Sequence, residues 1–136
     1  MRLFDTSFII DLVNSDPGAV RLARTVDEEA SLATISVISV HEYLFGVYFL
    51  YRREEEELKL KLDSARKELE RFETIPVTKE IAEASGRLQA DLTAEGSQIG
   101  INDLYIAATA THYGLPLVTR NITHFKRIPK LKLEHY

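Results

Sequence analysis

Short apolar stretches alternate with longer helix-forming segments along the whole chain, and this alternation limits the fold more than any other feature. Each apolar stretch has only three to six residues, which is the length of a short strand. Strands that alternate with helices form a parallel sheet covered by helices on both faces. We therefore expect an α/β fold with a short central parallel sheet of four to five strands. The expected strands are Arg2–Phe4, Ser31–Ser36, Thr74–Val77, Leu117–Thr119 and Leu131–Leu133.

Capping residues give the limits of the expected helices. Asp16 suits the N-cap position and Pro17 the first helical position, so a helix should run from this pair to about Glu29. Gly96 and Gly114 suit the position just after a helix, where a left-handed backbone is common. The other expected helices are one from about Val37, one over Thr78–Glu95 and one over Ile101–Tyr113.

Length and composition favour one globular domain over residues 1–136, because no repeat, linker or low-complexity tract divides the 136 residues. Cysteine is absent, which excludes a disulfide scaffold, a thiol nucleophile and a cysteine-ligated metal. A chain without cysteine fits the cytoplasm, where we expect this protein. The uncharged stretch Tyr43–Tyr51 has nine residues, about half of what a membrane span needs, so we expect no membrane association.

The net charge of the chain is −4, from 17 basic and 21 acidic residues. A protein that binds nucleic acid only by neutralising phosphates is normally basic. Either nucleic acid is not the partner, or divalent cations supply the missing positive charge.

Four polar positions fall where a parallel sheet would bring them together. Each has a simpler interpretation when taken alone. Asp5 could cap the following helix, and Asp103 could be an acid in a first helical turn. Ser39 and Glu42 match a capping box, and Asn121 could be a turn residue. The four positions are Asp5 after the first strand, Glu42 after the second, Asp103 at the start of NDLYIAATA, and Asn121 after the fourth strand.

The surroundings expected for the acids favour a functional interpretation. On a helix, Glu42 shares its face with Phe45 and Phe49, so we expect an apolar neighbourhood. Asp103 leads into Leu104–Ala110, which is apolar almost all round and should be central. A carboxylate among apolar groups is unfavourable unless it is paired or binds a metal. Neither acid has a Lys or Arg three or four positions away, so three converging acids predict a Mg²⁺ or Mn²⁺ site.

The same segments resemble the PIN-domain ribonucleases, and more narrowly the VapC-type toxins of prokaryotic toxin–antitoxin pairs. The resemblance covers the whole chain, and its most specific part runs from Asp103 to Phe125. The segments that carry it are LFDTS, the helical Glu42, NDLYIAATA and GLPLVTRNITHF.

The resemblance implies a PIN-like three-layer fold and a role for each matching residue. Asp5, Glu42 and Asp103 would hold Mg²⁺ or Mn²⁺. Asn121 completes the catalytic set at a position where many members have a fourth aspartate. The remaining matches are Thr6 and Ser7, which would support the first ligand, and His124, for which we expect no catalytic role. Apart from the resemblance, the basic side chains that could contact RNA phosphates are Arg120, Lys126 and Arg127, although each could serve solubility alone, which we favour for Lys126.

The activity implied by the resemblance is divalent-metal-dependent hydrolysis of RNA phosphodiester bonds by an endoribonuclease. Such a toxin would be inhibited by a cognate protein antitoxin. It would form a homodimer or a higher assembly with that antitoxin.

A charged segment, Tyr51–Phe72, carries a narrow apolar stripe at helical spacing. It could lie on the domain, or it could be a projecting arm that docks the antitoxin. We expect a mixed outcome, because the end of the stripe leads directly into the third strand. The residues expected to face the partner are Leu58 and Leu62, and those expected to face the core are Leu69 and Phe72.

Two other kinds of function share part of this sequence pattern. A receiver-like phosphoacceptor domain also gathers acids at strand ends, but it needs an aspartate after the third strand, and TIPVT has none. A PIN-like module that binds RNA or acts as a scaffold without cutting would be favoured by loss of one of the three acids. None is lost. The sequence has neither a phosphate-binding P-loop motif nor a dinucleotide-binding glycine motif.

Overall fold

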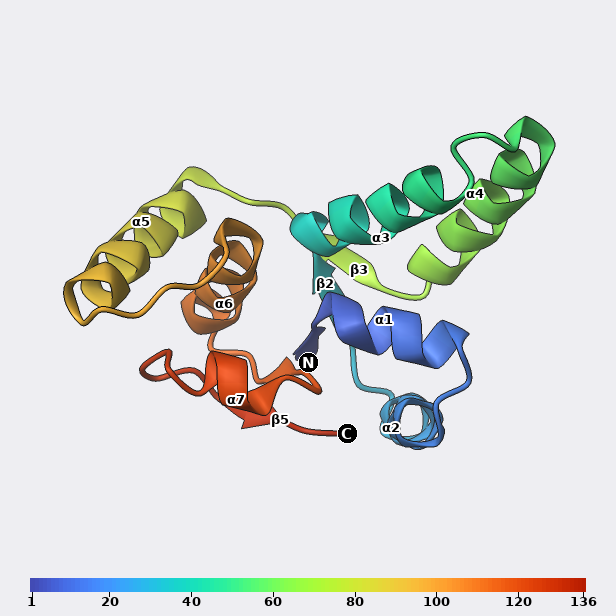
Figure 1. The fold of residues 1–136 in the computed structure, drawn as a ribbon. Coiled ribbons are helices and arrows are strands. Elements are labelled where there is room, and N and C mark those ends of the chain that lie inside the picture. The colour runs from blue at the N-terminus through green and yellow to red at the C-terminus, as the bar shows by residue number, and fades with distance from the viewer.

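The computed structural model describes all 136 residues and contains one five-stranded sheet. All neighbouring strands are parallel, and their order across the sheet is β3-β2-β1-β4-β5 (Figure 1). The expected parallel α/β fold is confirmed. The strands are β1 Arg2–Phe4, β2 Ala33–Ser36, β3 Glu73–Ile75, β4 Leu117–Val118 and β5 Leu133–Glu134.

Seven helices connect and cover the strands, and the capping residues explain several of their limits. The Asp16 carboxylate accepts a hydrogen bond from the Ala19 backbone N–H at 3.0 Å. Gly96 and Gly114 adopt the left-handed conformation, with φ of 77° and 64°, just after their helices. The helices are α1 Thr6–Val13, α2 Pro17–Glu28, α3 Val37–Leu50, α4 Glu55–Leu69, α5 Lys79–Ala94, α6 Ile101–Tyr113 and α7 Ile122–Phe125.

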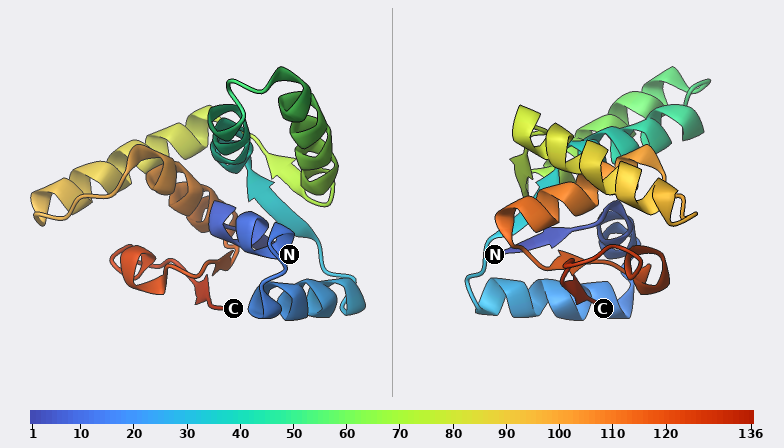
Figure 2. Two further views of the ribbon diagram at one scale, coloured as in Figure 1. Left: turned by 45° about the vertical axis from the view of Figure 1, so that its right-hand side comes forward. Right: turned by 90° about the vertical axis from the view of Figure 1, so that its left-hand side faces the viewer.

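The two faces of the sheet are covered by different helices, which gives three layers (Figures 1 and 2). Successive strand residues point to opposite faces. Leu3 of β1 packs in a cluster with residues of α5 and α6, whereas the next residue, Phe4, packs in a second cluster with residues of α1 and α2. Leu117 and Val118 of β4 divide in the same way. No helix is long and apolar enough to cross a membrane.

The strand order reverses between β1 and β4, and this reversal marks the expected ligand-binding position at the carboxyl end of the sheet. From β1 the chain builds outward through β2 and β3, and it then returns to place β4 on the other side of β1. Ligands of open parallel sheets bind where the direction of building reverses. The carboxyl ends of β1 and β4, which are followed by Asp5 and Thr119, meet at this point.

Helices α3 and α4 form a hairpin that projects from the body of the molecule (Figure 1). The apolar stripe of α4 is covered within the chain, because Leu62 is only 8% and Ala65 only 2% exposed. The expectation that Leu62 faces a partner is therefore wrong, while the expected burial of Phe72 is confirmed. The Tyr43 hydroxyl of α3 donates a hydrogen bond to Glu68 of α4 and ties the two helices together.

Candidate active site

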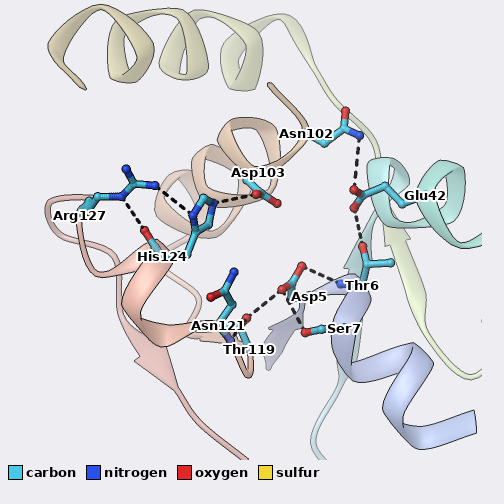
Figure 3. A network of polar contacts seen from close by, with 10 residues as sticks. All are labelled: Asp5, Thr6, Ser7, Glu42, Asn102, Asp103, Thr119, Asn121, His124 and Arg127. Atoms are coloured by element: carbon cyan, nitrogen blue, oxygen red, sulfur yellow. Dashed lines mark hydrogen bonds and ion pairs between the residues drawn. The ribbon is translucent and has the colours of Figure 1, made fainter. Parts of the chain in front are cut away.

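Asp5 is a buried carboxylate with several hydrogen-bond donors and no cation beside it. It is only 7% exposed at the carboxyl end of β1. Its Oδ1 accepts from the Thr6 backbone N–H at 2.8 Å, so the capping role weighed from the sequence is present. Its Oδ2 accepts from the hydroxyls of Thr119 at 2.8 Å and Ser7 at 3.2 Å (Figure 3).

The pKa of Asp5 is raised above its ordinary value. Burial is the largest cause, because it disfavours the charged form. The hydrogen bond from Thr119 acts in the opposite direction, and the negative charge of Asp103 raises the pKa further. The site therefore holds a carboxylate whose charge the protein alone does not fully stabilise.

Glu42 is not part of a capping box. Helix α3 begins at Val37, and its N-cap is Ser36, whose Oγ accepts from the Ile38 N–H at 3.1 Å. The Glu42 carboxylate lies across the site, where it accepts from the Thr6 hydroxyl at 2.7 Å and from the Asn102 amide at 3.4 Å (Figure 3). The hydroxyl of Thr6 thus holds Glu42, while its backbone N–H holds Asp5.

The apolar burial expected around Glu42 is wrong. Phe45 is 61% and Phe49 is 54% exposed, and Ser39 is the only buried residue of α3. Neither phenylalanine packs in the core, and Phe45 lies at the open cavity that Glu42 also lines. The expected burial of the Asp103 helix is confirmed, because α6 is buried over most of Leu104–Ala110.

Asp103 lies in the first turn of α6 and contacts a histidine from α7. His124 Nε2 lies 2.8 Å from Asp103 Oδ2. Arg127 contacts the same imidazole, with its guanidinium Nη2 at 3.0 Å from His124 Nδ1 (Figure 3). No sequence pattern predicts the pairing of these residues, because a helix as short as α7 has no periodicity.

The two other candidate residues, Asn121 and Arg120, have no hydrogen bond or ion pair with the three acids. The Asn121 side chain is exposed and makes no capping hydrogen bond, while its backbone N–H donates to Thr119 Oγ1 at 3.0 Å. Arg120 forms ion pairs with Asp16 at 2.7 Å and with Asp11 at 3.3 Å. The guanidinium proposed as an RNA contact is therefore already engaged by two carboxylates of α1 and the α1–α2 connection.

The three acids line one open cavity of about 560 Å³ at the carboxyl end of the sheet. None of them has a Lys or Arg partner. No group of three His, Asp or Glu side chains is close enough to coordinate one ion directly. The cavity lining includes Asp5, Thr6, Ser7, Glu42, Asn102 and Asp103.

The chemistry of these donors nevertheless fits a hard cation. All three acids offer only oxygen, which Mg²⁺ and Mn²⁺ prefer. Mg²⁺ usually keeps several waters and needs only one or two carboxylates, so the acids need not converge on one point. The raised pKa of Asp5 indicates a charge that a cation would stabilise.

The profile of the PIN domain family matches residues 2–131. This chain belongs to that family. It is 31% identical over 134 residues to Ribonuclease VapC2 of Rickettsia felis. This alignment covers 98% of this chain and 96% of the relative. It is 27% identical over 136 residues to the tRNA(fMet)-specific endonuclease VapC of Salmonella typhimurium, with coverage of 98% and 96%.

Solved structures agree with the sequence comparison. The fold superposes with a TM-score of 0.81 on a chain of the crystal structure of VapBC2 from Rickettsia felis bound to a DNA fragment from their promoter. That chain is 31% identical, and the match covers 99% of this chain and 98% of the other. The three-layer PIN-like architecture implied by the sequence is confirmed.

Proposed function

We propose that this protein is a divalent-metal-dependent endoribonuclease, the toxin of a toxin–antitoxin pair. The observation that carries the proposal is the cavity at the carboxyl end of β1, where three carboxylates from distant parts of the chain meet without a Lys or Arg. Membership of the PIN domain family and full-length similarity to proteins named Ribonuclease VapC support it. Since the substrate is RNA and the chain lacks cysteine, we place the protein in the cytoplasm.

Asp5, Glu42 and Asp103 would hold Mg²⁺ or Mn²⁺ in this cavity. Ser7 and the backbone of Thr6 fix the Asp5 carboxylate, and the Thr6 hydroxyl fixes Glu42. Asn121 follows β4 beside Asp5, with its side chain free to reach the substrate.

The chemistry of the proposed reaction is hydrolysis of a phosphodiester bond. A bound divalent ion would lower the pKa of a water and neutralise the charge that builds up on the phosphate oxygens. The chain contributes carboxylates that repel RNA until a cation is present, which explains how an acidic protein can act on a polyanion. The Ser7 hydroxyl donates to Asp5 and not to a histidine, so no base activates it, and we assign the attack to water.

An antitoxin is the partner that would control this activity. Several exposed apolar side chains lie on α3, where Leu50 is 70% and Tyr48 is 46% exposed, whereas the stripe of α4 is covered at Leu62. A groove of about 450 Å³ between α1, α3 and α4 shares Ile10 and Glu42 with the acid cavity. An antitoxin segment in this groove would reach the carboxylates directly. The same exposed face could support a homodimer or a larger complex with the antitoxin.

Cleavage of end-labelled RNA tests the proposal. The protein should cut RNA internally with Mg²⁺ or Mn²⁺, stop when the metal is chelated, and lose activity on Asp103→Asn. Binding of RNA without any cleavage under these conditions would favour the alternative, a PIN-like RNA-binding or scaffold module.

A further inference from the structure

The side chains of Arg127, His124 and Asp103 form a continuous chain of contacts that ends at the acid cavity (Figure 3). Arg127 holds the histidine at two points. Its Nη2 lies 3.0 Å from the ring nitrogen Nδ1, and its Nε donates to the His124 carbonyl oxygen at 3.2 Å. The other ring nitrogen, Nε2, lies 2.8 Å from Asp103 Oδ2.

The available N–H donors determine which group donates and which accepts in each of these contacts. A guanidinium group has only N–H donors, so Nδ1 of His124 must accept. The single proton of the neutral imidazole then lies on Nε2, which donates to Asp103. One oxygen of Asp103 is occupied by this bond, and no donor of the chain is bonded to the other, Oδ1.

We infer that Arg127 and His124 are positioning residues that turn Asp103 so that one carboxylate oxygen faces the metal. The inference rests on the proposed metal site. It gives a positioning role to His124, for which no catalytic role was expected, and to Arg127, which the sequence offered only as a possible phosphate contact. Partners of metal ligands fix the orientation of the ligand, and their loss commonly weakens metal binding 10- to 100-fold. In many metal sites a carboxylate orients a histidine that binds the metal, whereas here the histidine would orient a carboxylate that binds the metal.

Charge alone would give the opposite effect, which makes the inference testable. A positive guanidinium near the cavity repels a cation, so removing it should strengthen metal binding if only charge matters. If Arg127 acts by holding His124, its removal should weaken metal binding. Lys126 is the matched control, because it is an exposed neighbour of the same charge that makes no contact with His124.

The experiment measures Mn²⁺ affinity of the full-length protein by isothermal titration calorimetry, without RNA. We expect His124→Ala to weaken Mn²⁺ binding about 10-fold. His124→Gln should restore most of this loss, because its amide can donate to Asp103. Arg127→Gln should weaken binding about threefold or more, whereas Lys126→Gln should leave it unchanged or slightly stronger. Melting temperatures confirm that each variant is folded.

A second measurement reads the histidine directly. Long-range ¹H–¹⁵N correlation spectra of the metal-free protein should show His124 with its proton on Nε2. Arg127→Gln should shift this population towards the other tautomer, and Lys126→Gln should not.

The outcomes separate this inference from the proposed function. Wild-type protein that does not bind Mn²⁺ would overturn both the metal site and the inference. Mn²⁺ binding that is lost on Asp103→Asn but unchanged on His124→Ala would leave the metal site standing and overturn the inference alone. Equal losses in His124→Gln and His124→Ala would also overturn it.

Discussion

The acid cavity and the α3–α4 hairpin both contain many carboxylates, but a carboxylate is buried only in the cavity. In the hairpin, Glu57 pairs with Lys61 at 3.9 Å and Asp63 with Arg66 at 3.6 Å, with all these side chains well exposed. In the cavity, Asp5 is buried and its pKa is raised. Burial of a carboxylate, and not the number of acids, therefore distinguishes the candidate site from a solvated surface.

The largest expected difference between the two regions is catalytic. Asp5→Asn or Asp103→Asn should lower RNA cleavage at least about 100-fold, because each removes a charge that would stabilise the proposed cation and through it the transition state. Asp63→Asn in the hairpin makes the same chemical change and should leave activity unchanged. Cleavage rates with Mg²⁺ or Mn²⁺ give the comparison, and full activity in either cavity variant would contradict the assignment.

Glu42 lies on the hairpin helix α3, but its carboxylate lines the acid cavity. A substitution of Glu42 therefore tests whether this residue acts in catalysis or only in the structure of the hairpin. Glu42→Gln can still accept the hydrogen bond from Thr6, so the melting temperature should change little. Cleavage should fall at least about tenfold, because the charge is lost. Glu57→Gln is the hairpin control. Preserved activity in Glu42→Gln would assign this residue to positioning only.

The hairpin should respond to changes in packing. Leu62→Ala should lower the free energy of unfolding by about 2–5 kcal/mol, because the side chain is buried against the chain itself. Leu60 lies two residues earlier on the same helix and is 65% exposed, so Leu60→Ala should change stability by less than about 0.5 kcal/mol. Denaturant unfolding measures both. Equal stability in the two variants would show that α4 does not pack as described.

The smallest expected effect is the change that Asp5→Asn makes in the stability of the metal-free protein. Because the folded-state pKa of Asp5 is raised, its protonated form stabilises the fold at low pH, and this contribution is lost as pH rises through the folded pKa. At neutral pH, Asp5→Asn should therefore raise the melting temperature by a few degrees, and the difference should shrink as the solution is acidified. A variant that melts below the wild type at pH 7 would show that the hydrogen bonds of Asp5 outweigh its burial.

The strands and the meeting of the acids could be predicted from the sequence because both depend on strong local signals, whereas the order of the strands across the sheet was not predicted. Arg2–Phe4 is bounded by Asp5, and Gly114 ends α6 just before β4. Once the strands are known to be parallel, their carboxyl ends must lie at one edge. Helix α6 leads back to the start of β4 and so begins near that edge, which brings Asp103 near Asp5.

The surroundings of the acids could not be predicted in the same way. An apolar face that awaits a partner has the same sequence pattern as a buried face, so Phe45 and Phe49 were expected to enclose Glu42 and instead are exposed. Ser36 and Ser39 both suit an N-cap, and only the start of α3 shows that Ser36 takes this role. His124 lies in a helix of four residues, which is too short for any periodic signal.

The hydrogen bond between Thr119 and Asp5 has a consequence for synthesis of the chain, because the two residues are 114 positions apart. The central strand β1 is translated first, yet its neighbour β4 comes last but one among the strands. Contacts between distant residues form slowly, and they cannot form before both partners have left the ribosome. A nascent chain therefore carries Asp5 and Glu42 without the rest of the cavity, and nuclease activity should arise only when translation has passed residue 119.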